Sequence, residues 1–302
     1  MREDIVKEIE EIKKAKDAVL LVHNYQLPEI QDIADILGDS LDLSRRAKET
    51  EKSVIVFCGV RFMAETAKIL SPHKRVFLPV YDAGCPLADM VTAEKLKKFK
   101  EQNPDYWIVS YVNTNADVKS VSDVCCTSAN AIKVVKNIPA KKILFVPDKN
   151  LGDYVKKNVP EKEIKLWDGY CIVHLKIELE EVKKVKQMHP DALLLVHPEC
   201  EPEVVELTDE VLSTNGMIRF VKESKNKEFI IGTEEGLIYR LKNENPDKIF
   251  YPAGKAVVCA NMKKTRLEDV LKALKYEQYE ITLPDEIINK AQIALNRMLE
   301  YL

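Results

Sequence analysis

Short runs of apolar residues recur along the chain and alternate with longer segments in which the apolar positions follow a helical spacing. The run AVLLV, which begins at Ala18, is continuous and of strand length, as is typical of a parallel strand covered on both faces. The next predicted strands are SVIVFCG and the residues before Cys85, with helices over 28–38, 39–50 and 60–70 between them. The pattern predicts a unit made of a strand, a pair of helices, a strand, a helix and a strand.

This unit occurs three times. Its first strand recurs as DAVLLVHNY from Asp17, DYWIVSYVN from Asp105 and DALLLVHPE from Asp191, at offsets of 88 and 86 residues. The later strands and helices follow in the same order in each copy. Self-similarity at a fixed period indicates a repeated structural unit. Because strands alternate with helices within each copy, the sequence predicts parallel sheets in layered α/β domains.

The repeat predicts three such domains with short sheets, related by a pseudo-threefold axis, with the active site at their central junction. We expect the domains at residues 1–86, 87–172 and 173–261. Residues 262–302 should form a helix (RLEDVLKALK), a short strand (YEITL) and a terminal helix, and should pack back on the first domain. No linker is rich in glycine and serine, so the three units should form one body.

Composition and charge restrict the class of partner. The chain has 302 residues, of which 46% are hydrophobic, enough for a large folded protein. The net charge is −3 with acids and bases interspersed, and no basic stripe suggests a nucleic acid partner. The first residues form a charged amphipathic segment rather than a signal peptide, and no apolar run is long enough to cross a bilayer. We therefore expect a cytoplasmic protein that acts on small molecules.

Several common kinds of active site are absent from the sequence. There are only nine glycines and no G-x-G, so the chain has neither a dinucleotide-binding fingerprint nor a Walker phosphate loop. It also has no G-x-S-x-G, the nucleophile turn of many serine hydrolases. These absences argue against nicotinamide, ATP and serine hydrolase chemistry.

Three cysteines, Cys85, Cys171 and Cys259, each follow a predicted strand at the same place in the repeat. One free cysteine is usually a small core residue, but three at matched positions favour a metal, and thiolates alone favour an iron–sulfur cluster or zinc. Three thiolates would leave one iron of a 4Fe-4S cluster open as a Lewis acid that can assist dehydration. Zinc with a nitrogen ligand from His174 is the alternative. The other cysteines are interpreted as structural: Cys58, Cys125, Cys126 and Cys200.

Polar side chains also recur at matched positions. The first strand of each copy ends in a polar pair, and a hydroxyl follows 17 residues after the first member of the pair. Such hydroxyls commonly cap helices, but a helix start that faces a cavity also binds anions. An acid two residues after a histidine lies on the same side of a strand, an arrangement that suits acid–base catalysis. The pairs are His23 and Tyr25, Tyr111 and Asn113, and His197 and Glu199, and the hydroxyls are those of Ser40, Ser128 and Thr214 with Ser213 beside it.

The segments HNYQLPEIQDIADILGDS, YVNTNADVKSVSDVCCTSANA, WDGYCIVH, HPEC, LSTNGM and CANMKK resemble quinolinate synthase, and the similarity covers nearly the whole chain. The resemblance implies three homologous α/β domains around a central 4Fe-4S cluster that is held by one cysteine from each domain. It implies condensation of iminoaspartate (iminosuccinate) with dihydroxyacetone phosphate to form quinolinate, with loss of phosphate and water, in NAD biosynthesis. An aspartate oxidase or dehydrogenase would then supply the imine.

The resemblance also implies roles for individual residues. Tyr25 and Glu199 would be the main proton-transfer groups, with His174 near the phosphate or the cluster. In CANM, Met262 replaces the second thiol of a C-x-x-C that can form a regulatory disulfide in some members, so that form of redox control should be absent here. The implied cluster ligands are Cys85, Cys171 and Cys259, and the residues implied around the dicarboxylate are His23, Ser40, Tyr111, Asn113, Ser128, His197, Glu199, Ser213 and Thr214.

Three other hypotheses fit the residues. The chain could be a zinc or iron–sulfur hydro-lyase that acts on another small carboxylic acid through the same Lewis acid. It could be an iron–sulfur sensor or carrier, which would not need His197, Glu199 and Tyr25 to converge beside the cluster. It could also be a metal-free binding protein whose three repeat cysteines lie in its core.

Overall fold

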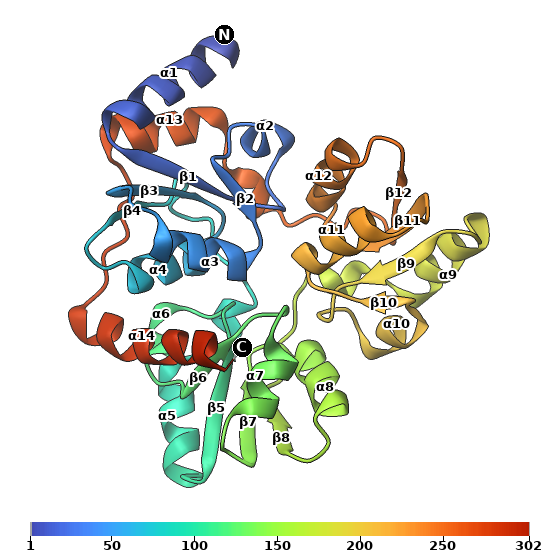
Figure 1. Ribbon diagram of the computed structural model, residues 1–302. Helices are drawn as coiled ribbons and strands as arrows, with labels where there is room; N and C mark the ends of the chain where they lie inside the picture. Colours follow the sequence, from blue (N-terminus) through green and yellow to red (C-terminus); the bar gives the residue numbers. More distant parts are fainter. Residues whose placement is uncertain (1, 302) are drawn as a thin grey trace.

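Each repeat folds around one four-stranded parallel sheet, and the three sheets lie in three lobes that meet at the centre of the molecule (Figure 1). The computed structural model describes residues 2–301, so Met1 and Leu302, at the ends of the predicted terminal helices, lie outside it. The strand order is the same in each sheet: β2-β1-β3-β4, β6-β5-β7-β8 and β10-β9-β11-β12. The α/β fold class and the threefold repeat are therefore confirmed.

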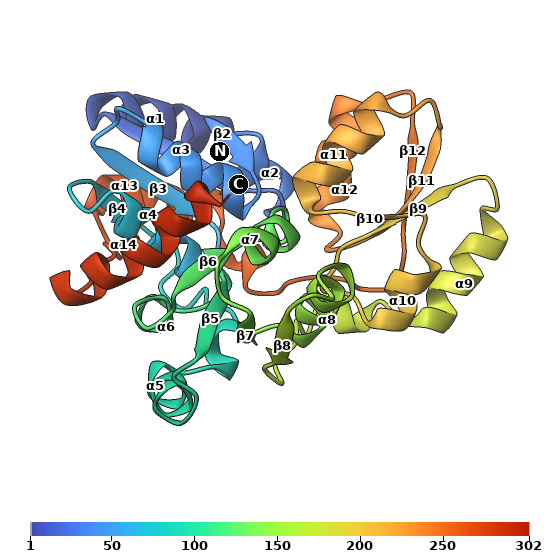
Figure 2. The same ribbon diagram turned by 60° about the horizontal axis from the view of Figure 1, so that its bottom comes forward.

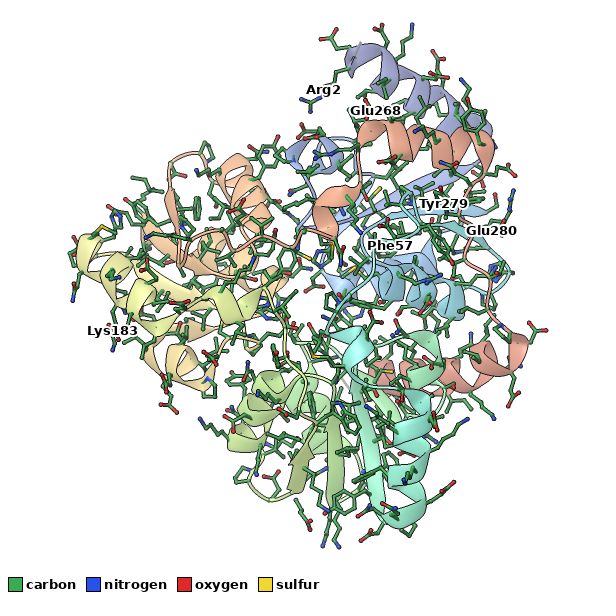
Figure 3. The ribbon with its side chains drawn as sticks, turned by 180° about the vertical axis from the view of Figure 1, so that it is seen from behind. Arg2, Phe57, Lys183, Glu268, Tyr279 and Glu280 are labelled. Atoms are coloured by element: carbon green, nitrogen blue, oxygen red, sulfur yellow. The ribbon has the colours of Figure 1, made fainter. Side chains whose placement is uncertain are left out.

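The first lobe shows how the repeat is built. Every residue of its central strand is buried, as expected for a parallel strand covered on both faces. Phe57 packs in the interior of this lobe (Figure 3). The elements of the lobe are α1 (Arg2–Ala15), β1 (Ala18–His23), α2 (Pro28–Gln31), β2 (Ile36–Gly38), α3 (Ser40–Glu49), β3 (Val54–Cys58), α4 (Arg61–Leu70) and β4 (Arg75–Phe77).

The other two lobes follow the same order. The second contains α5 (Ala93–Gln102), β5 (Tyr106–Tyr111), α6 (Ala116–Lys119), β6 (Val124–Cys126), α7 (Ala131–Asn137), β7 (Lys142–Val146), α8 (Lys149–Asn158) and β8 (Glu163–Leu166). The third contains α9 (Leu179–Met188), β9 (Leu193–Val196), α10 (Pro202–Leu207), β10 (Glu210–Val211), α11 (Thr214–Glu223), β11 (Glu228–Gly232), α12 (Gly236–Glu244) and β12 (Ile249–Pro252).

One element of the predicted unit is wrong. The helix expected over 28–38 ends at Gln31, and Ile36–Gly38 instead forms the edge strand β2 beside β1. The equivalent strands β6 and β10 also lie where the repeated unit predicts helices. Each unit therefore has four strands rather than three. These edge strands have only three, three and two residues, too few for an apolar alternation to be recognised.

An aspartate fixes each of these short edge strands to its neighbour. Asp209 accepts the backbone N–H of Leu194 at 2.8 Å and donates its own N–H to the carbonyl of Leu194 at 3.1 Å. The same exchange joins Asp35 to Leu20 and Asp123 to Ile108. In each repeat a lysine also forms an ion pair with this aspartate: Lys13 with Asp35, Lys100 with Asp123 and Lys186 with Asp209.

A second lysine is repeated at a helix end. Lys74, Lys162 and Lys248 donate to carbonyl oxygens at the C-termini of α3, α7 and α11, where four backbone acceptors have no partner within the helix. A positive charge there also interacts favourably with the helix dipole. These contacts hold the three helices whose opposite ends face the centre of the molecule.

The last segment of the chain returns to the first lobe and also reaches the second. Figure 2 shows the segment after β12 running from the third lobe to the first. There α13 (Leu267–Tyr276) packs on α1, and its apolar residues share a core with β1. The predicted strand YEITL forms only a single antiparallel bridge, Glu280 with Phe77 at the edge of β4, with Tyr279 and Glu280 at the margin of the lobe (Figure 3). The terminal helix α14 (Asp285–Glu300) contacts α4 of the first lobe and β6 and α6 of the second.

The division into residues 1–86, 87–172 and 173–261 stays a prediction; each sheet lies within one of these ranges. Among residues 2–301, no helix combines the length and the apolar character needed to cross a membrane.

We expect Asp209→Ala to destabilise the protein by about 1–3 kcal/mol, because the buried N–H of Leu194 would lose its acceptor. The control is Asp191→Ala, which removes an exposed aspartate next to the same strand. Urea unfolding should show a lower midpoint for Asp209→Ala alone, and equal midpoints for the two variants would contradict the proposed role.

Candidate active site

The three lobes meet at a cavity. Because the strands in each sheet are parallel, their carboxyl ends lie at one edge of the sheet, and the residues that follow them face this cavity. Apart from Ser213, every candidate site residue lines it: His23, Tyr25, Ser40, Cys85, Tyr111, Asn113, Ser128, Cys171, His174, His197, Glu199, Thr214 and Cys259.

The hydroxyls of the candidate set have different positions. Ser213 caps α11 by accepting the N–H of Gly216 at 3.2 Å, and Asp39 caps α3 in the same way through the N–H groups of Leu41 and Asp42. The hydroxyls of Ser40 and Thr214, the first residues of these helices, are therefore not the caps. Ser128 lies 3.0 Å from the Nε2 atom of His197.

A short 3-10 helix begins three residues after each candidate cysteine: Ala88–Met90 after Cys85, His174–Lys176 after Cys171 and Met262–Lys264 after Cys259. Burial raises the pKa of all three thiols, that of Cys85 to about 12. The backbone N–H of the third residue after each cysteine opposes this rise by hydrogen bonding to the sulfur. Each sulfur thus has an N–H donor that favours its thiolate form.

Two buried acids position two of these cysteines. Asp148 accepts the backbone N–H of Cys171 at 3.1 Å, and Glu234 accepts that of Cys259 at 3.0 Å. Burial raises the pKa of both carboxyls. Sequence reasoning missed both acids, although Glu234 follows Asp148 by the repeat offset of 86 residues. The equivalent residue of the first repeat is Val60, which lines the cavity but has no carboxylate that could accept the N–H of a cysteine.

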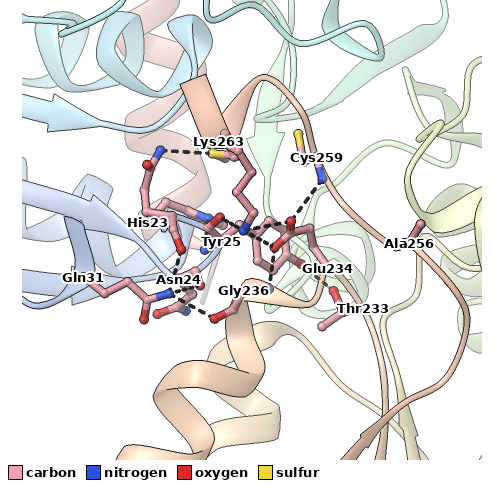
Figure 4. Close-up of polar contacts among 12 residues, drawn as sticks. His23, Asn24, Tyr25, Gln31, Thr233, Glu234, Gly236, Ala256, Cys259 and Lys263 are labelled. Atoms are coloured by element: carbon pink, nitrogen blue, oxygen red, sulfur yellow. Dashed lines mark hydrogen bonds and ion pairs between the residues drawn. The ribbon is translucent and has the colours of Figure 1, made fainter. Parts of the chain in front are cut away.

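Glu234 also joins the third lobe to the first. Lys263 lies 3.0 Å from the Glu234 carboxylate and donates to the carbonyl oxygen of Tyr25, and Gly236 donates its N–H to the same carboxylate at 2.7 Å (Figure 4). One buried carboxylate therefore connects the Cys259 segment to the turn that carries Tyr25.

Hydrogen bonds link Tyr25 to His174, and a close contact leads from His174 to Glu199. The Tyr25 hydroxyl lies 2.5 Å from the hydroxyl of Thr233, which lies 2.9 Å from Nε2 of His174. The other ring nitrogen of His174 is hydrogen-bonded to the sulfur of Cys171 at 3.2 Å and also lies 3.2 Å from Oε2 of Glu199. Thr233, shown beside Tyr25 in Figure 4, was not predicted from the sequence, because a single threonine at the end of a strand carries no signal.

Glu199 is the carboxylate at the centre of the cavity. Burial raises the pKa of Glu199, but contacts of its carboxylate with the rings of His174 and His197 outweigh this, so the net shift is downward. Burial lowers the pKa of His23 to about 3 and that of His174 to about 4, so both imidazoles are neutral near pH 7. Within residues 2–301, Oε1 of Glu199 and Oδ1 of Asn113 are buried without a hydrogen-bond partner, which suits two atoms that await a ligand.

A buried donor holds each of two turns that carry site residues. Lys119 donates to the carbonyl oxygens of Val112 and Thr114, which flank Asn113. Gln31, the equivalent residue 88 positions earlier, donates to the carbonyls of residues 24 and 26, which flank Tyr25 (Figure 4). Burial lowers the pKa of Lys119 to about 8. The two residues differ in chemistry, so the sequence did not reveal their common role.

Three side chains at the cavity have the spacing of metal ligands. Among the His, Cys, Asp and Glu residues in the range 2–301, Cys171, His174 and Glu199 form a group of three whose potential ligand atoms all lie within 4.8 Å of one another. A buried cavity with such a group, beside linked acid and base side chains, defines an α/β enzyme whose site could hold a metal.

Comparison with known proteins identifies the family. Residues 7–300 match the family model described as quinolinate synthetase A protein. A protein of Caldicellulosiruptor saccharolyticus named quinolinate synthase is 58% identical over 298 residues, which cover 99% of this chain and 98% of that protein. Proteins of the same name from Thermodesulfovibrio yellowstonii (58% over 294 residues, 97% of each chain) and Geobacter metallireducens (52% over 300 residues, 99% and 98%) are also similar. The chain belongs to the quinolinate synthase family.

Two substitutions at Lys119 test the turn contact. Lys119→Gln should keep a donor for the two carbonyl oxygens, as Gln31 does in the first repeat, and should leave stability and KM close to those of the unsubstituted protein. Lys119→Leu removes the donor, and we expect it to lower the free energy of unfolding by about 1–3 kcal/mol and to raise KM. Urea unfolding and steady-state kinetics measure both effects. Equal losses in the two variants would show that the hydrogen bonds are not what matters.

Proposed function

We propose that the chain is a quinolinate synthase that condenses iminoaspartate with dihydroxyacetone phosphate and releases phosphate and water to form quinolinate for NAD biosynthesis. The observation that carries the proposal is the identity of 51–58% to proteins of that name over nearly their whole length. The convergence of thiols, imidazoles and Glu199 on one cavity supports it.

The proposed cofactor is a 4Fe-4S cluster held by Cys85, Cys171 and Cys259. The matched N–H groups that face the three sulfurs support this assignment, since hydrogen bonds to sulfur tune iron–sulfur sites. In the described residues the three sulfurs do not form a group within 4.8 Å, whereas one zinc ion with Zn–S bonds of about 2.3 Å would need them within about 4.6 Å of one another. When bound, the cluster would supply Lewis-acid assistance to the loss of water through an iron without a cysteine ligand.

A zinc ion on Cys171, His174 and Glu199 is the alternative, because these donors are close enough for one ion. That arrangement would correspond to a hydro-lyase for another small carboxylic acid. It would use Glu199 as a ligand and leave no ionised base at the centre of the cavity.

The proposed substrate contacts follow from the wall of the cavity. The carboxylates would be bound by the side chains at the strand ends and by the hydroxyls at the starts of α3 and α11, where the positive end of the helix dipole favours anions. Ser213 would act indirectly, because its hydroxyl caps α11 and fixes Thr214. The proposed contact residues are His23, Ser40, Tyr111, Asn113, Ser128, His197, Glu199 and Thr214.

Tyr25 and Glu199 would move the protons. Burial raises the pKa of the Tyr25 hydroxyl well above its usual value, so it stays protonated and can donate, whereas Glu199 is ionised and can accept. Once Tyr25 has donated its proton, a proton taken by Glu199 would return to it through the contact with His174 and the hydrogen bonds of Thr233. This pairing of acid and base suits the proton transfers of carbon–carbon bond formation and imine closure.

The proposal also concerns the source of the imine. Iminoaspartate would be supplied by an aspartate oxidase or dehydrogenase, and the reaction would take place in the cytoplasm. No macromolecular substrate is required.

We expect Cys85→Ala, purified without oxygen, to lose the brown chromophore and the formation of quinolinate from the two substrates. Cys58→Ala is the control, because Cys58 is buried in the first lobe and does not line the cavity. Iron and sulfide analysis with an absorption spectrum gives the result. A Cys85→Ala protein that keeps its iron, sulfide and activity would disprove the ligand assignment.

Glu199→Gln should retain iron and sulfide but lose at least about a hundredfold in kcat, because a neutral amide cannot serve as the base. Glu201→Gln removes an exposed carboxyl two residues further on and should behave like the unsubstituted protein. Comparing the two variants also distinguishes the other hypotheses. An iron–sulfur sensor or carrier would not depend on Glu199, and a zinc site with Glu199 as a ligand would lose its metal in Glu199→Gln.

A further inference from the structure

A second hollow lies directly outside the cavity, at the starts of α3 and α11. It opens to solvent. Asp39 and Leu41 line both spaces, so these side chains form the partition between the hollow and the cavity. We call this hollow the outer mouth; its wall includes Asp42, Arg45, Ala129, Ser213, Arg219 and Arg240.

The two spaces differ in charge. In the described part of the chain, the cavity wall has no lysine or arginine, and its acidic residues are Asp39, Glu199 and Glu234. The outer mouth has three arginines and two aspartates, Asp39 and Asp42. Asp39 is buried and accepts two N–H groups at the start of α3, which stabilise its carboxylate there. The mouth is therefore the positive region next to the cavity, although the whole chain carries a net charge of −3.

The three arginines are not equivalent. Arg240 is held in the wall, since its Nε lies 2.6 Å from Glu244 and its Nη1 donates to Asn24 at 2.7 Å. Arg45 and Arg219 are exposed, and neither forms a hydrogen bond or ion pair with any residue in the range 2–301. The guanidinium groups of Arg45 and Arg219 are thus available to bind a ligand.

We propose that Arg45 and Arg219 form an anion-collecting site that captures the phosphate or carboxylate group of an incoming substrate and delivers it to the cavity. A guanidinium group matches both anions through paired N–H donors. Exposed arginines hold an anion weakly, so it can pass to the helix starts and imidazoles inside. A local positive field also raises the rate of encounter with an anion. The identity of the anion, dihydroxyacetone phosphate or the dicarboxylate, rests on the proposed function.

The test compares Arg45→Gln, Arg219→Gln and the double variant with Arg46→Gln. Arg46 neighbours Arg45 on α3 and is also exposed, but it does not line the mouth and lies 3.9 Å from Glu49. All single variants change the net charge equally. We expect the double variant to lower kcat/KM for dihydroxyacetone phosphate roughly three- to tenfold at low ionic strength, with a smaller effect on kcat. The difference should nearly vanish in about 0.5 M potassium chloride, where charges are screened.

Kinetics of the double variant that match those of Arg46→Gln at every salt concentration would overturn the proposal. If the unsubstituted enzyme forms no quinolinate at all, the proposed function fails instead, and a second measurement decides on the anion site. Inorganic phosphate should slow the modification of Arg45 and Arg219 by phenylglyoxal, followed by mass spectrometry, but not that of Arg46. Equal protection of all three arginines, or of none, would then reject the site.

Discussion

The structure depends on one constraint, which is that three parallel sheets must direct their carboxyl ends to the same cavity. A parallel sheet places the residues that follow its strands at one edge, so each repeat can offer a thiol, a polar pair and a hydroxyl in a fixed relation. None of the repeats contains the whole set. The site exists only where the three edges meet, and the lysines and aspartates that repeat in each lobe maintain the sheets and helices that form those edges.

The chemistry comes from the positions at which the repeats differ. Three residues after the cysteine stand Ala88, His174 and Met262, so only one of three equivalent places has an imidazole. At another place, Val60 corresponds to the acids Asp148 and Glu234. The three repeats share one backbone arrangement but place different side chains at equivalent positions, so each side of the cavity has its own chemistry. A reaction that joins two different substrates needs different side chains to bind each of them.

Much of the fold could be predicted from the sequence, because the same order of strands and helices occurs three times and the central strands are continuous apolar runs. The edge strands were missed since an aspartate, rather than an apolar pattern, fixes them: the Asp209 side chain completes the pairing of a strand of two residues. The residues of the cavity wall at repeated positions could be predicted, whereas the supporting residues Thr233 and Lys119 could not. Their importance comes from contacts with distant segments, such as that between Thr233 and Tyr25, and no local motif reports such contacts.

The return of α13 to the first lobe has a consequence for synthesis on the ribosome. The core that α13 shares with α1 and β1 unites residues near the two ends of the chain. Domains generally fold as they emerge, N-terminal first. Here the lobe that emerges first is completed last. One apolar face of its sheet stays exposed until α13, near the end of the chain, has been synthesised. Premature termination would leave that face uncovered and available to chaperones and proteases, which would allow the cell to remove incomplete copies.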